Sequence, residues 1–245
     1  MSRLLVISLS VVLSISLSVA AFADDREVVV KPLESAIATP IVLGPAGPAQ
    51  ACRVGNLNAP AFAISNFIFP PEEYKLAFDP GATCSVCPMG MSVTSIHVLL
   101  QTAGACDLVM EVNLEFASYP GDPDCPNPGP EVCTSGLFNV SLPAPGLYDV
   151  ALPITCDCVS MGRVYLLSFY IDSASCDPVP DLVTDAGPAT ACTNWNDFGA
   201  GWYDLLGQYP TWPGNLLFYA DVECCSPPVP VGKSTWGAIK SLYKN

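Results

Sequence analysis

The sequence predicts an all-β protein, an antiparallel β-sandwich of jelly-roll-like form that is stabilised by disulfides and followed by a short C-terminal helical tail. Three observations predict this class. Short runs of alternating apolar and polar residues recur along the chain, as in strands with one face in a core. Turn-forming residues separate these runs, because the 245-residue chain holds 25 prolines and 18 glycines. Twelve cysteines supply an even number of disulfide partners.

The first element, residues 1–23, has the pattern of a secretory signal peptide. A positive start ends at Arg3, an apolar run without charge extends to Val19, and the small-residue site "AFA" precedes two aspartates. The alternative is a membrane anchor, for which the run is slightly too short. We therefore expect an exported protein, extracellular or on the cell surface, that meets a membrane only through this segment or the C-terminal tail.

Residues 24–50 are expected to form an N-terminal extension and linker, in which "REVVV" is a candidate edge strand, and residues 51–226 to form the sandwich. The clearest strand is 106–118, where every second residue from Leu108 to Phe116 is apolar and the residues between are mostly polar. A short "TAG" turn joins it to an apolar run at 91–102, which predicts a hairpin. Further strands are expected at 135–142, 146–154, 163–172 and 214–224.

All of the cysteines follow residue 23, and an exported chain meets an oxidising compartment. A disulfide framework is therefore expected, although the connectivity does not follow from the spacing. The "CSVC" motif at 84–87 is interpreted as two structural half-cystines rather than a redox or zinc site, because the chain has a single histidine and no βαβ context. The expected disulfide residues are Cys52, Cys84, Cys87, Cys106, Cys125, Cys133, Cys156, Cys158, Cys176, Cys192, Cys224 and Cys225.

The formal net charge of −14 argues against nucleic acid as a partner, because phosphates require a basic surface. The only histidine, His97, lies within an expected strand and outside any hydrolase motif, so a structural role is favoured and no catalytic residue is assigned. The leading interpretation is a non-enzymatic binding or structural module. The alternatives are an extracellular glycoside hydrolase that uses two carboxylates, and a purely structural envelope component.

Oxygen ligands gather in the loop "GDPDCPNPGPE", where Asp122, Asp124 and Glu131 are candidate calcium ligands. The spacing does not follow the EF-hand loop and prolines interrupt it, so solvated turn residues are the favoured interpretation. No cofactor is expected, with calcium as the alternative.

Three of the four tryptophans fall within residues 193–215, interleaved with amides and carboxylates. Aromatic rings stack on the apolar faces of sugars while polar groups bond the hydroxyls, so this segment is a candidate glycan-binding site. The alternative is that the rings fill one end of the core. The candidate ligand-binding residues are Trp195, Trp202, Tyr203, Trp212, Asn194 and Asp197.

Residues 227–245 are expected to form a proline-rich linker and an amphipathic tail. One face of a short helix would carry Trp236, Ile239, Leu242 and Tyr243, with Lys240 near its C-terminal end. "STWGAIKSLY" resembles the T-W-G-x-I-K-x-L-Y tails of secreted proteins from some Gram-negative bacterial lineages, and "SFYIDS" resembles the disulfide-bearing β-sandwich modules of these proteins. The resemblance implies a sorting or anchoring signal that export or anchoring machinery recognises, and it implies no catalytic position. The alternative is a frayed terminus or a short helix on the body.

Overall fold

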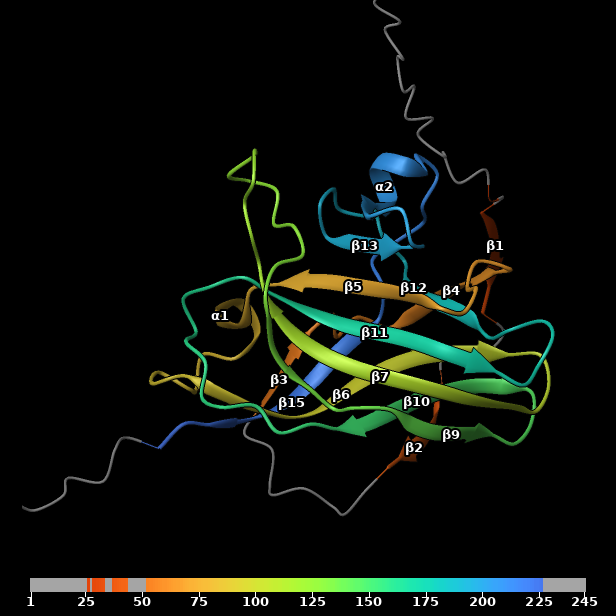
Figure 1. The fold of residues 1–245 in the computed structure, drawn as a ribbon, viewed down its shortest axis with the longest axis horizontal. Helices are drawn as coiled ribbons and strands as arrows, with labels where there is room; N and C mark the ends of the chain where they lie inside the picture. The colour runs from red at the N-terminus through yellow and green to blue at the C-terminus, as the bar shows by residue number, and fades with distance from the viewer. Residues whose placement is uncertain (1–25, 27, 34–36, 44–51, 227–245) are drawn as a thin grey trace, which may run out of the picture.

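A computed structural model describes residue 26 and residues 28–33, 37–43 and 52–226 (Figure 1). The expected signal peptide and the expected C-terminal helix lie outside these residues. Within the described part, no helix is both long and apolar enough to cross a bilayer. The described part is almost entirely β-structure arranged in two sheets, which confirms the predicted all-β class.

The first sheet has eight strands, in the order β1, β4, β12, β6, β10, β2, with β15 paired to β6 and β3 paired to β15. All pairings in the described residues are antiparallel except that of β2 with β10. The strands of this sheet are β1 Val29–Pro32, β2 Thr39–Val42, β3 Cys52–Gly55, β4 Pro60–Ser65, β6 Met91–Thr102, β10 Gly146–Pro153, β12 Asp181–Asp185 and β15 Phe218–Cys224.

The second sheet has seven strands, in the order β14, β13, β5, β11, β7, β8, with β9 paired to β7. Two one-turn helices, α1 Pro80–Thr83 and α2 Leu205–Gln208, begin at aspartate caps, as an aspartate side chain accepts from the free N–H groups of a first turn. The strands of this sheet are β5 Glu72–Phe78, β7 Cys106–Phe116, β8 Glu131–Thr134, β9 Phe138–Leu142, β11 Tyr165–Ala174, β13 Asn194–Asp197 and β14 Trp202–Asp204.

The core lies between the two sheets and follows from the period-two pattern. On β7, alternate residues from Leu108 to Leu114 are buried, and on β6 the alternate residues Ile96, Val98 and Leu100 are buried in the same cluster. Side chains of opposite parity point away from the core, because successive residues of a strand face opposite sides of a sheet. Each sheet therefore has an outer face, and both candidate sites below lie on these outer faces.

The predicted hairpin between 91–102 and 106–118 is wrong, although both strands are present. β6 belongs to the first sheet and β7 to the second, so the residues that connect them cross from one sheet to the other. The reason is that β6 already pairs with β10 along one side and with β12 and β15 along the other, which leaves no edge for β7.

Residues 24–50, expected to be an extension and linker, contribute β1 and β2, the first and last strands in the order of the first sheet. β1 pairs with β4 at one edge, and β2 pairs with β10 at the other. Between them, Leu33 and Ala38 pack on a second, smaller apolar cluster on the outer face of the sheet. The cluster consists of Leu99, Leu147, Val183, Leu217 and Tyr219.

The expected disulfide framework is present, and no described cysteine is free. The two cysteines of the CxxC motif bond different distant partners, as the structural interpretation predicted. The pairs are Cys52–Cys84, Cys87–Cys224, Cys106–Cys176, Cys125–Cys192, Cys133–Cys156 and Cys158–Cys225.

Candidate functional site

The structure divides the predicted ligand-binding residues into a buried group and a partly exposed group. Trp195, Trp212 and Asn194 are buried. The Trp212 ring centre lies 5.0 Å from that of Phe67 in the core. The Asn194 amide donates to Asn215 (2.9 Å) and its carbonyl accepts from the backbone of Leu216 (2.8 Å). These three side chains therefore stabilise the fold in this structure.

Trp202, Tyr203 and Asp197 are half-buried and lie on the β13–β14 hairpin at the edge of the second sheet. The turn of this hairpin is held by the Asp197 carboxylate, which accepts from the N–H groups of Gly199 (2.7 Å) and Gly201 (3.3 Å). Both glycines have positive φ, of 92° and 107°, which other residues rarely adopt. Asp197 and Trp202 are register partners, so the turn fixes the place of the Trp202 ring on the sheet.

A buried ion cluster lies against Trp202. Lys75 on β5 is only 2% exposed, and its ammonium lies 3.9 Å from the centre of the Trp202 ring. The same ammonium donates to Glu115 on β7 and lies 3.2 Å from the carboxylate of Glu73. Burial of a lysine is costly unless opposite charge compensates it, and here two carboxylates and a π-face do so.

The polar face of β7, which the alternating pattern predicted to face solvent, is only partly exposed. Asn113 and Glu115, expected to face water, are buried, because Lys75 and Glu73 of β5 bond them. Burial raises the pKa of Glu115, and the nearby Glu73 adds to the rise, while Lys75 opposes it. One oxygen of each side chain, Asn113 Oδ1 and Glu115 Oε2, has no hydrogen-bond partner within the described residues.

We name Trp202, Lys75, Glu73, Glu115 and Asn113 the Trp202 cluster. The aromatic member was found from sequence, but the other four were missed, because they lie on strands β5 and β7 far from the tryptophan-rich segment. The only local signal was a lysine close to two glutamates in β5, which does not reveal the partners on β7 and β14.

The candidate calcium ligands do not converge. Asp122 and Asp124 are exposed in the loop after β7, where an Asp122 oxygen accepts from the Asp124 N–H (2.9 Å), and Glu131 is exposed at the start of β8. Within the described residues, the single cluster with metal-ligand spacing is formed by cysteine sulfurs, at positions 52, 84 and 87. These sulfurs belong to disulfides and therefore offer no thiolate. The calcium interpretation stays a prediction.

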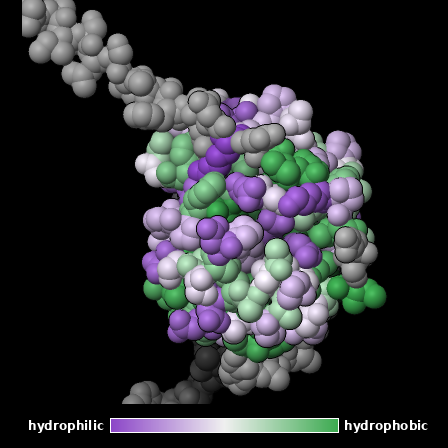
Figure 2. All heavy atoms as spheres, turned by 90° about the vertical axis from the view of Figure 1, so that its right-hand side faces the viewer, coloured by the Kyte–Doolittle hydropathy of each residue, from purple (hydrophilic) through white to green (hydrophobic). Residues whose placement is uncertain are grey.

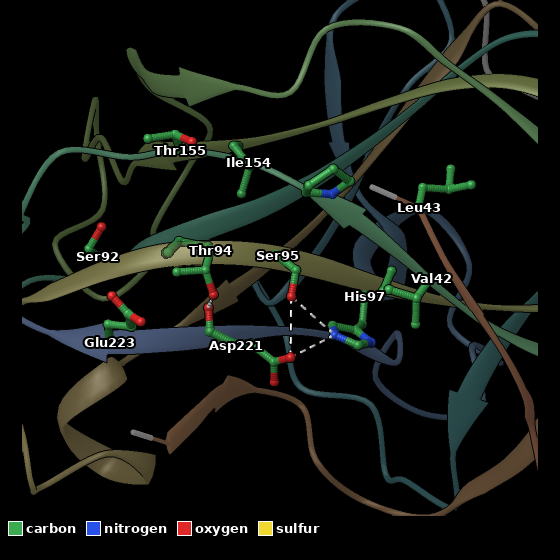
Figure 3. Close-up of a pocket in the computed structure, with 13 residues that line it drawn as sticks. Val42, Leu43, Ser92, Thr94, Ser95, His97, Ile154, Thr155, Asp221 and Glu223 are labelled. Atoms are coloured by element: carbon green, nitrogen blue, oxygen red, sulfur yellow. Dashed lines mark hydrogen bonds and ion pairs between the residues drawn. The ribbon is translucent and has the colours of Figure 1, made fainter. Parts of the chain in front are cut away.

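A second polar cluster surrounds His97 on the outer face of the first sheet (Figure 3). His97 Nδ1 lies 2.9 Å from Asp149 of β10, and Nε2 lies 3.1 Å from Asp221 of β15. Ser95 Oγ lies 3.3 Å from Nε2 and donates to Asp221 (3.2 Å). The Tyr219 ring stacks on the imidazole at 4.3 Å.

Ser95, His97 and Asp149 have the order of a catalytic triad, but the second carboxylate argues against that chemistry. In a triad the serine hydroxyl donates to the imidazole, whereas Ser95 here donates to Asp221, and the same Asp221 carboxylate occupies the Nε2 side of the His97 ring. Burial alone would raise the pKa of Asp149, but the hydrogen bonds from His97 and Tyr219 outweigh burial and lower it. This geometry describes a structural ion cluster, consistent with the role favoured for His97 from sequence.

The His97 cluster forms one wall of an open groove of about 480 Å³. Polar residues of β6 and β15 line one side, where Figure 3 shows Ser95, His97 and Asp221 converging and Glu223 lying further along β15. Apolar residues, including Val42 and Leu43, line the other side. We call this the His97 groove. At the end of the sandwich that Figure 2 presents, polar and apolar residues are interspersed.

Comparison with known proteins gives a family and distant structural similarities. No curated protein matches the chain. The chain is similar to the cysteine protease and lectin-like domains of Cwp84, a surface layer associated protein of Clostridium difficile, with 12% identity and a TM-score of 0.46 over 74% of this chain and 37% of that one. It is also similar to a clostridial Cwp84 cysteine protease after propeptide cleavage, with 13% identity and a TM-score of 0.43 over 64% of this chain and 37% of that one. The chain thus spans little more than a third of either protein.

A family profile described as a domain of unknown function, DUF7451, matches residues 49–222. This range begins just before β3 and ends within β15, so it takes in most of both sheets. The chain therefore belongs to the DUF7451 family.

Proposed function

We propose that this protein is an exported, non-enzymatic binding module of the cell surface or extracellular space, and that it binds carbohydrate through the Trp202 cluster. The observation that carries the proposal is the Trp202 ring, half-exposed on a sheet edge and held by a buried lysine. Six disulfides support an oxidising location.

The chemistry around the ring suits a sugar. An indole held in one orientation offers a flat apolar surface at low cost in conformational entropy. Asp197, the register partner of Trp202, places a partly exposed carboxylate beside it, whereas Tyr203 faces the other side of the hairpin and stacks on Phe198 at 4.8 Å. Glu73 adds a carboxylate that is partly accessible to solvent. Acceptors around an aromatic platform are what hydroxyl groups require.

The glycoside hydrolase alternative is disfavoured at this site. Glu73 and Glu115 are close enough to bond one ammonium, which brings two carboxylates together as a glycosidase needs. However, the Lys75 ammonium lies between them, where the scissile bond would have to lie. Glu115 is also buried. The pair therefore has an ion-cluster geometry rather than an open catalytic one.

A glycan array with the oxidised protein tests the proposal. We expect retention of at least one glycan class, and Trp202→Ala to weaken it about tenfold, the upper range for one aromatic stacking contact. Leu57→Ala is the control, because Leu57 is an exposed apolar residue that lies beside the first sheet. Absence of any retained glycan would reject carbohydrate and favour the structural envelope component. Equal losses in both variants would remove Trp202 from the site.

A further inference from the structure

We propose that the His97 groove binds the basic C-terminal segment of the same chain, residues 232–245. This inference is independent of the proposed carbohydrate site, because the groove lies on the outer face of the opposite sheet. The segment itself lies outside the described residues, so its conformation forms no part of the argument.

The first argument for this docking is the acidic character of the groove. Its lining contains Asp221 and Glu223 but neither a lysine nor an arginine. The charge of Asp221 is compensated by Arg53, whose Nε donates to it (2.9 Å), and its other oxygen lies 3.1 Å from His97 Nε2. Glu223, by contrast, has no ion pair or hydrogen bond within the described residues, so one carboxylate of the groove is left for an added cation.

The charge of the segment is opposite to that of the groove. Lys233, Lys240 and Lys244 lie within it and it contains no acid, whereas the whole chain carries a formal charge of −14. These lysines are three of only nine basic residues in the chain. Within the described residues, Arg26, Arg53 and Lys75 pair with carboxylates. The segment holds three of the six basic residues that remain in the sequence.

Apolar surface carries the second step. Val42 is 65% exposed at the rim of the groove, and Leu43, Pro153 and Ile154 continue the apolar side. The segment carries Trp236, Ile239, Leu242 and Tyr243 at steps of three, three and one residues. An amphipathic segment that lays its apolar side into a groove and its lysines toward carboxylates is a common mode of peptide recognition.

The third argument is that the linker is long enough for the segment to reach the groove. The described chain ends at Ser226, two residues after β15, and Glu223 of β15 lines the groove. Nine residues, 227–235, separate Ser226 from Trp236. Nine extended residues span about 30 Å, and a proline-rich stretch slightly less, which is enough to return along β15 to His97. Docking within one molecule therefore needs no rearrangement of the body.

His97 provides a direct reporter, because a single histidine gives a single imidazole Hε1 resonance. We compare full-length protein with the full-length Lys240→Glu/Lys244→Glu variant by NMR. Docking predicts a shifted His97 resonance in the variant. Lys31→Glu, on the edge strand β1, is the control and should leave the resonance unchanged. An identical resonance in all three proteins would overturn the proposal.

Tryptic cleavage after Lys233 and Lys240 gives a second measurement. In the full-length chain, Glu223→Gln should accelerate these cuts about threefold, because it removes the carboxylate left for a lysine. Glu131→Gln, an exposed acid on the second sheet, is the matched control and should leave the rates unchanged. Equal rates in both variants would contradict docking. Protection that rises with protein concentration would assign the groove to the segment of a second copy and overturn the intramolecular arrangement.

Discussion

The ammonium of Lys75 lies 3.9 Å from the centre of the Trp202 ring, and this contact joins the interior of the second sheet to its edge hairpin. Lys75 is fully enclosed on β5, whereas Trp202 is half-exposed on β14. A lysine with two carboxylate partners on one side and a π-face on the other has little freedom to move. The orientation of the exposed ring is therefore determined by the buried Lys75 ammonium and by the two carboxylates that hold it.

Removal of the Lys75 charge should destabilise the protein strongly. We expect Lys75→Met to lower the free energy of unfolding by about 3–5 kcal/mol at pH 7, because Glu115 is then buried without its cation. Urea unfolding at pH 7 measures this. Lys31→Met, at an exposed position of β1, should change stability by less than about 0.5 kcal/mol.

The same variant should show a pH dependence of known sign. Burial raises the pKa of Glu115 above its ordinary value of 4.5, and loss of Lys75 should raise it further. The folded state then holds a proton that the unfolded state has released, so stability falls as pH rises through this interval. Lys75→Met should therefore lose less stability at pH 5 than at pH 7. Equal losses at both values would contradict a charged Glu115 in the cluster.

Substitution of a buried tryptophan should destabilise the protein more than substitution of the half-exposed Trp202. Trp212 is 3% exposed, so we expect Trp212→Ala to cost about 3–5 kcal/mol, whereas Trp202→Ala should cost about 1 kcal/mol. Trp212→Phe should cost less than Trp212→Ala, because it keeps a ring and removes an indole N–H that has no partner within the described residues. Chemical denaturation measures all three. A cost for Trp202→Ala as large as that for Trp212→Ala would place both rings in the core.

The His97 cluster should stabilise the fold through Asp149. The pKa of this carboxyl lies below its ordinary value of 3.8, so the ionised form stabilises the folded state above that pH, and the contribution is lost as pH falls through the folded-state value. Asp149→Asn should cost about 1–3 kcal/mol at pH 7 and less near pH 3. Urea unfolding at both pH values checks this, and a cost that grows on acidification would contradict the assignment.

The disulfides should contribute differently to the free energy of unfolding, according to the length of the loop that each closes. Cys87–Cys224 joins residues 137 apart, and Cys133–Cys156 joins residues 23 apart. Loop-closure entropy gives about 5 kcal/mol for the first and about 3.4 kcal/mol for the second. Replacement of both cysteines by serine should therefore cost more stability for Cys87–Cys224 than for Cys133–Cys156, measured by urea unfolding under oxidising conditions. A larger loss for the shorter loop would show that native-state packing, rather than chain entropy, dominates.

Much of the fold could be predicted from local pattern. The run at 91–102 matches β6 at both ends, and 106–118 extends only two residues beyond β7. Alternation identifies a strand because it depends only on neighbouring residues. The partner of a strand depends on the edges that the rest of the sheet leaves available, and for this reason the predicted hairpin failed while both of its strands are present.

The sites were less accessible to sequence reasoning. Asp149 and Asp221 lie 52 and 124 residues from His97, so no spacing in the sequence joins them. Residue type also did not distinguish the buried tryptophans from the exposed one, because the same ring can fill a core or line a surface. Trp195 and Trp202 are seven positions apart in one segment, yet only Trp202 is partly exposed, and the difference follows from their places in the hairpin and sheet.

The edge strands of the first sheet have a consequence for self-association. β1 and β2 are only four residues long, and each contains a proline, Pro32 in one and Pro40 in the other. Proline lacks the N–H that an incoming strand would bond, and Lys31 adds an exposed charge to β1. Along the described strands β1 and β2, neighbouring molecules therefore meet no long, regular row of unpaired backbone groups, which disfavours edge-to-edge aggregation through these two strands.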